Sequence, residues 1–303
     1  DPLTDTDMVT AQCAQPCDIA CPDRIPSRAV RELLQGDDGP SAPPPSGAPL
    51  GVRDRRGDGA VVATLAALCG ADRGVAAIVA DAAHRRAVLN DVLAPHRLGV
   101  EVAVLGGGRC DPDALNARMT SAAGRPALLI LEYGVLPTVT LPPDVHVAVV
   151  DPPSDAMAAD WVQTHAAGRW LHLLWGEEES AFALTVAERQ LAFRPVAAEI
   201  WRGLAGAAHH PWGDHLDRLL LGPSAAMRPP AAMANAVTAL AQIGLLRIDA
   251  TGIQVVPETG AQLDDAPHAV ACRARLEGVR AYLARAGSLT FAGSAISCGD
   301  ARA

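Results

Sequence analysis

The chain has 303 residues, half of them hydrophobic, which is enough for two domains with buried cores. All 25 basic residues are arginine, so a Walker A loop and a Schiff-base lysine are both excluded for this segment. The net charge of −9 opposes non-specific attraction to phosphate backbones, and nucleic-acid binding would therefore need a local basic patch.

Residues 1–35 are expected to be the end of a preceding domain with a short helix at 27–34, because the chain does not begin with Met and has no secretory leader. Seven cysteines without a pairing pattern indicate a reducing, cytoplasmic location. The spacing of Cys13, Cys17 and Cys21 would place three thiols on one helix face. A fourth ligand is missing and two prolines oppose the helix, so these cysteines are weak metal candidates.

Residues 36–51 are rich in Pro, Gly and Ser and are predicted to be a linker. The string RDRRGDG follows, with Arg53, Arg55 and Arg56 as the sharpest basic patch of the chain. These arginines could contact a phosphate backbone or a neighbouring domain. A solvated charged turn is an equally good interpretation.

Residues 52–193 alternate between helix and strand patterns. The strands are expected at 75–80, 100–105, 127–131, 145–150 and 170–175, and they are continuous apolar runs. The helices are expected at 59–69, 84–93, 113–122, 155–164 and 177–191. Such runs are typical of a parallel sheet covered on both faces, which predicts a doubly wound, mostly parallel five-stranded α/β domain of Rossmann-like type. No apolar run approaches the roughly 20 residues that cross a bilayer, so we expect no membrane partner.

The carboxyl ends of parallel strands form the usual ligand crevice of such sheets. Six charged or titratable residues are expected on this rim: His84, Arg85, Arg109, Glu132, Asp151 and Glu177. A ligand could bind there, although the sequence lacks the G-x-G-x-x-G loop of dinucleotide sites and an assembled acid, base and nucleophile. We therefore assign no catalytic residue, and we interpret Asp151 first as a strand terminator.

Residues 194–262 are predicted to form a winged helix-turn-helix, with helices at 194–204, 213–221 and 230–243 and two short strands at 245–248 and 253–257. The would-be recognition helix has no basic residue, and its candidates for base contacts are Asn235, Thr238 and Gln242. A structural or protein-contact role is therefore favoured. His209 and His210 are interpreted as loop residues, and residues 263–303 as a C-terminal helix with a disordered tail.

Several segments in this order resemble a known family. They are RDRRGDG, VAVVDPP, LHLLWGEEESAFALTVAERQLAFRP, NAVTALAQIGLLRID and RARLEGVRAYL. Over residues 20–286 the chain resembles the C-terminal region of RecJ-type exonucleases, which degrade single-stranded DNA from the 5′ end in repair and recombination. The resemblance implies DHH and DHHA1 domains upstream in the same protein, where Asp and His residues hold Mn or Mg. None of those metal ligands lies in this chain.

The resemblance implies a non-catalytic accessory region without a cofactor of its own, which aids engagement of single-stranded DNA or docking of the single-stranded-DNA-binding protein. The residues expected to contact DNA or a partner are Arg53, Arg55, Arg56, Arg85 and Arg109. The alternative is a ligand-sensing regulator that binds duplex DNA through the winged helix. Duplex binding that is specific for sequence would favour that alternative.

Overall fold

The computed structural model describes residues 47–70, 74–93, 101–105, 127–222, 228–256, 260 and 262–291. These residues divide into two compact units. Unit 1 contains the described residues up to Leu184 together with Tyr282 to Phe291, and unit 2 runs from Thr185 to Ala281. Within the described ranges, no helix is both long and apolar enough to cross a membrane.

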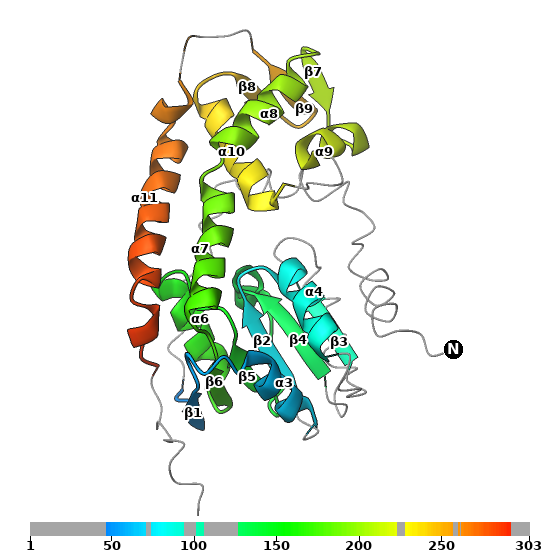
Figure 1. Ribbon diagram of the computed structural model, residues 1–303. Coiled ribbons are helices and arrows are strands. Elements are labelled where there is room, and N and C mark those ends of the chain that lie inside the picture. Colours follow the sequence, from blue (N-terminus) through cyan, green and yellow to red (C-terminus); the bar gives the residue numbers. More distant parts are fainter. Residues whose placement is uncertain are drawn as a thin grey trace, which may run out of the picture. The chain divides into compact units, whose positions relative to one another are not determined.

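The centre of unit 1 is a parallel sheet with the strand order β1-β6-β5-β2-β4-β3 (Figure 1). Its strands are β1 Gly51–Asp54, β2 Val75–Val79, β3 Glu101–Leu105, β4 Ala127–Glu132, β5 His146–Val149 and β6 Trp170–Leu173. The five strands expected from the sequence are all present and all parallel. The sheet is larger than expected, because β1 adds a sixth strand beside β6. The linker predicted at 36–51 falls largely outside the described residues, and its last residue begins β1.

Helices cover both faces of this sheet. On one face, α3 Val61–Gly70 and α4 Ala82–Leu93 pack against alternate residues of the strands. On the other face lie η3 Tyr133–Thr138, α6 Ala156–Ala166 and the short η6 Ala286–Ser288. Because both faces are covered, the central strand β2 is buried at every position, which explains why it is a continuous apolar run.

Helix α7 Glu177–Leu191 begins at the expected residue. Its first turn carries three glutamates, which suit the positive end of the helix macrodipole. The carboxylate of Glu179 also accepts a hydrogen bond from the backbone N–H of Gly176 at 2.7 Å. The glutamate triplet therefore contributes to the start of the helix.

Unit 2 contains α8 Arg194–Leu204, β7 His209–Pro211, α9 Asp214–Leu221, α10 Pro230–Gln242, β8 Leu246–Ile248, β9 Gly252–Val255, η5 Leu263–Asp265 and α11 Pro267–Leu283. Its strands form an antiparallel sheet in the order β7-β9-β8. The two expected short strands correspond to β8 and β9. Strand β7 was not expected, and it makes a correction necessary. His210 is no loop residue, because it is buried in β7 with its Nε2 2.8 Å from the carbonyl oxygen of Leu204.

Helix α10 is the core of unit 2. Every residue from Ala232 to Leu240 is buried, and four of these nine are alanine, whose small side chain lets neighbouring helices approach closely. Asn235 donates from its amide nitrogen to the carbonyl of Gln190 at 3.0 Å, and its oxygen lies 2.9 Å from the imidazole of His268. The face of α10 that would read bases is therefore occupied by contacts inside unit 2.

Candidate functional site

The predicted rim at the carboxyl ends of the strands does bring residues together. The carboxylate of Asp151, after β5, is fully buried and accepts hydrogen bonds from the N–H of Ala80 at 2.9 Å and from Arg85 Nε at 3.1 Å. Arg85 also pairs with it through a terminal nitrogen, and its guanidinium lies 4.2 Å from the centre of the Phe182 ring. Burial raises the pKa of Asp151, and the contacts with Arg85 and Ala80 oppose that rise.

The other rim residues also make contacts in this part of unit 1. Glu132 accepts a hydrogen bond from the N–H of Ala82 at 2.8 Å, at the start of α4. His84 lies 2.9 Å from Asp81 in the same helix turn. The rim is thus a set of contacts that joins strand ends to α4, and Asp151 stabilises it as well as terminating β5. Glu177 is exposed, and Arg109 lies outside the described residues.

Arg56, from the predicted basic patch, is committed to structure. It pairs with Asp54 and lowers the pKa of that carboxyl. It also donates to the backbone carbonyls of Ala286 and Leu289, at 3.3 and 2.8 Å. Its guanidinium lies 5.2 Å from the ring centre of Trp175. Arg56 therefore fastens the segment around η6 to the end of β1.

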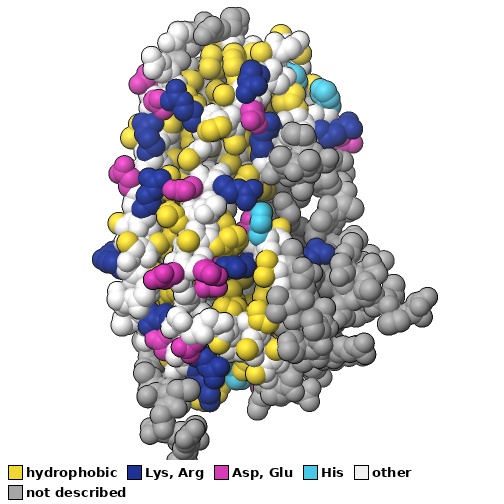
Figure 2. All heavy atoms as spheres, in the orientation of Figure 1, with side chains coloured by type: hydrophobic (Ala, Val, Ile, Leu, Met, Phe, Trp, Pro, Cys, Tyr) yellow, Lys and Arg dark blue, Asp and Glu magenta, His cyan; other side chains and the backbone are white. Residues whose placement is uncertain are grey.

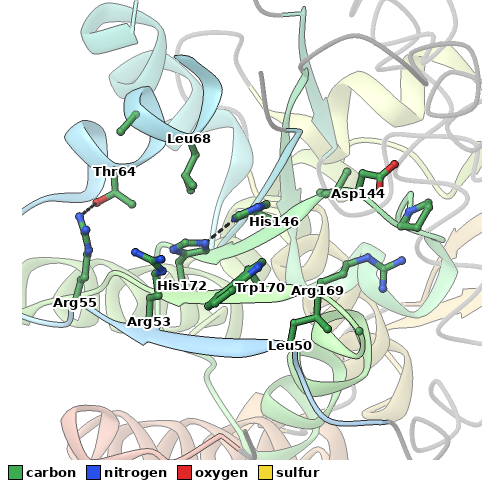
Figure 3. A pocket seen from close by; sticks show the side chains of 14 residues that line it. Leu50, Arg53, Arg55, Thr64, Leu68, Asp144, His146, Arg169, Trp170 and His172 are labelled. Atoms are coloured by element: carbon green, nitrogen blue, oxygen red, sulfur yellow. Dashed lines mark hydrogen bonds between the residues drawn. The ribbon is translucent and has the colours of Figure 1, made fainter. Parts of the chain in front are cut away.

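Arg53 and Arg55 point the other way, into a pocket of about 510 Å³ between α3 and the open side of β1, β6 and β5 (Figure 3). The floor is made by side chains that alternate along these strands. The register pairs Gly51 with Trp170 and Arg53 with His172, so all four lie on the same face. The indole of Trp170 lies across Gly51, where a β-carbon would come within 2.4 Å of the ring. Glycine is what allows Trp170 to cover the sheet edge.

Two histidines stack on the floor of the pocket. Nδ1 of His146 lies 2.9 Å from Nε2 of His172, and the ring centres are 5.2 Å apart (Figure 3). His172 is 3% exposed, and burial lowers its pKa from the usual 6.5 to about 4. Electrostatic interactions with His146, Arg53 and Arg55 lower the pKa of His172 in the same direction. His172 is therefore a neutral imidazole at pH 7, held in a strongly positive surrounding.

Positive side chains predominate in the lining of the pocket. Its described lining includes Arg53, Arg55 and Arg169 and a single carboxylate, that of Asp144. On the face shown in Figure 2, in contrast, arginines and acidic side chains are interspersed over the described residues. An anion is therefore favoured in the pocket although the whole chain is acidic.

Sequence reasoning found Arg53 and Arg55 but missed Trp170, His146 and His172. The signal was present, since a histidine interrupts each of two apolar strand runs at a position that faces the sheet surface. A polar residue inside such a run is either a partnered core group or part of a site. His146 and His172 become neighbours only through the pairing of β5 with β6, which the sequence alone does not show.

The remaining candidates do not form a metal centre in the part of the chain that can be described. No group of three or more His, Cys, Asp or Glu side chains that could hold a metal ion occurs among the described residues. Cys13, Cys17 and Cys21 lie outside those residues. In unit 2, two of the three base-reading candidates are held by contacts, Asn235 as above and Gln242 by the N–H of His268 at 2.8 Å. The third, Thr238, is buried, and its hydroxyl has no hydrogen-bond partner among the described residues.

No protein-family model matches this chain, and no curated protein matches it.

Proposed function

We propose that the chain is an accessory, non-catalytic region of a RecJ-like 5′–3′ exonuclease that engages single-stranded DNA through unit 1. The observation that carries the proposal is that Arg53 and Arg55 line one pocket together with the indole of Trp170. Proteins that hold single strands combine arginines along the backbone with aromatic rings on which bases stack. The proposed activity belongs to DNA repair and recombination in the cytoplasm, with the metal-dependent DHH and DHHA1 domains upstream.

For unit 2 we propose a winged helix-turn-helix that serves protein contact, with the single-stranded-DNA-binding protein as the partner. The chain order of helix, strand, two helices and two strands supports this fold, and α10 contacts α8, α9 and β8. The burial of α10 argues against base reading by this helix. The alternative, a ligand-sensing regulator of duplex DNA, is favoured by the existence of the pocket and opposed by that burial.

The test is binding of a labelled 20-nucleotide oligo(dT), followed by fluorescence anisotropy at several salt concentrations. A double variant, Arg53→Ala with Arg55→Ala, is compared with a charge-matched control, Arg202→Ala with Arg247→Ala, at two exposed positions of unit 2. If the pocket arginines each neutralise a phosphate, the double variant lowers the slope of log K against log salt by about 1.4, at roughly 0.7 per phosphate. The control leaves the slope unchanged.

Equal slopes for the two double variants would refute the proposal, and so would the absence of binding at low salt. A duplex of the same length serves as the second ligand, because tighter and sequence-specific duplex binding would select the regulator instead. In the same preparation we expect no cleavage of the single strand with added manganese. Reproducible cleavage that a chelator abolishes would overturn the non-catalytic assignment.

A further inference from the structure

The pocket under α3 has one group that the contacts described so far leave without a role. Nδ1 of His172 is buried and has no hydrogen-bond partner among the described residues, although Nε2 of the same ring meets His146. Buried polar atoms are almost always paired, so this nitrogen is an exception in the floor of the pocket. His172 lines the pocket, so a ligand bound there would lie next to this imidazole.

The cations define the charge of that ligand. Arg169 is already used, because its guanidinium donates to the carbonyls of Leu141 and Pro142 at 2.7 and 3.0 Å. The guanidinium of Arg55 donates once, to the hydroxyl of Thr64 at 3.2 Å, and Arg53 is an exposed residue. Arg53 and Arg55 therefore keep guanidinium donors for an oxyanion, which arginine binds through paired N–H groups.

The remaining walls define its shape. The indole of Trp170 offers a flat apolar surface beside Arg53, whose guanidinium lies 5.2 Å from the ring centre (Figure 3). Leu50 and Leu68 add aliphatic contacts from either side. The volume of about 510 Å³ is within the usual range of small-molecule sites. A ligand with a planar ring and an attached anionic group would satisfy the aromatic and the charged walls together.

We propose that this pocket is a nucleotide-binding site, with the phosphate at Arg53 and Arg55 and the base stacked on Trp170. The assignment rests on the proposed function in one respect, since it names the pocket as the place where a single strand is held. The same chemistry is presented by a free mononucleotide and by a nucleotide within a strand. The experiment distinguishes these two ligands because it measures binding of a mononucleotide and of an oligonucleotide separately.

The experiment uses the full chain and isothermal titration calorimetry with three probes: thymidine 5′-monophosphate, thymidine and inorganic phosphate. The monophosphate is expected to bind about tenfold or more tightly than either fragment, because it alone reaches both the cations and the ring. Trp170→Leu should bring the monophosphate close to the affinity of inorganic phosphate. Arg53→Gln with Arg55→Gln should bring it close to the affinity of thymidine.

Arg202→Gln with Arg247→Gln is the matched control and should leave all three affinities unchanged. Circular dichroism melts verify that each variant is folded. If Trp170→Leu does not fold, Trp170→Phe is used instead, because it keeps an aromatic ring. The site is disproved if the monophosphate binds no better than phosphate, or if the pocket variants bind it as the wild type does.

The oligo(dT) arm separates this site from the proposed function. Monophosphate that binds no more tightly than inorganic phosphate, together with oligonucleotide binding whose salt slope still depends on Arg53 and Arg55, would refute the nucleotide site and leave engagement of single-stranded DNA standing. Binding of the monophosphate without any binding of the oligonucleotide would support the site and refute the proposed function. Loss of both ligands in the same variants supports both.

Discussion

The buried imidazole of His172 predicts a defined loss of stability in mild acid. Its pKa falls from 6.5 to about 4 on folding, mainly because burial disfavours the charged ring. Between pH 6.5 and pH 4, His172 is protonated in the unfolded chain but stays neutral in the folded chain. The contribution to stability is therefore complete above pH 6.5 and is lost as the pH falls toward 4. Once the loss is complete, well below pH 4, it amounts to about 3 kcal/mol of the free energy of unfolding. About 2 kcal/mol of this has been lost at pH 5.

The assay is urea unfolding followed by circular dichroism at pH 7.5 and pH 5.0, for the wild type and for His172→Gln. The variant removes the titrating group, so it should lose about 2 kcal/mol less than the wild type between the two pH values. The part of the cost of the lost contact with His146 that does not depend on pH is present at both pH values and cancels. His84→Gln is the matched control, since that side chain is 53% exposed. If the wild type and His172→Gln lose equal stability, the reasoning fails.

Three further substitutions, two of them with a matched control, test the packing inside each unit by the same urea assay. Asp151→Ala leaves its guanidinium partner unpaired and should cost about 3–5 kcal/mol, whereas Glu188→Ala, at an exposed ion pair, should cost less than about 1 kcal/mol. Gly252 has a φ of 155°, and a β-carbon there would lie 2.1 Å from a carbonyl oxygen of β7. Gly252→Ala should therefore lower the free energy of unfolding by about 1–3 kcal/mol. Its control, Gly134→Ala, lies in open space and should change the free energy of unfolding by no more than about 0.5 kcal/mol. Gly51→Ala displaces the indole above it and should cost about 1–3 kcal/mol. Equal costs within either matched pair, or no cost at Gly51, would contradict the contacts described here.

The sequence predicted the elements whose signals are local. Helix α7 was predicted with the bounds it has, because a glutamate triplet marks its first turn and an apolar periodicity follows. The central strands were found because burial on both faces requires continuous apolar runs. Strands β1 and β7 were missed, since GVRD and HHP are short and polar and are held by backbone pairing with distant strands. Such pairing leaves little trace in the sequence of the strand itself.

The candidate site was harder to predict because it depends on register. Arg53 and His172 are 119 positions apart in the chain, and they become neighbours only through the parallel pairing of β1 with β6. The general rule for wound sheets directed attention to the carboxyl ends of the strands. In this chain the charged groups there bind one another, whereas the pocket lies over the opposite half of β5 and β6, near His146 and Trp170.

The string RDRRGDG shows how a missed strand changed the functional interpretation. As a charged turn, its three arginines count as one basic patch. In the structure the string begins in strand β1, and its pairing continues to the hydrogen bond from the N–H of Arg55 to the carbonyl of Leu173. Alternate side chains of a strand lie on opposite faces of the sheet. Arg53 and Arg55 then enter the pocket, while Asp54 and Arg56 neutralise each other on the other face. The alternation separates two arginines that can bind an anion from one that holds the fold, and it explains how an acidic chain concentrates positive charge at one place.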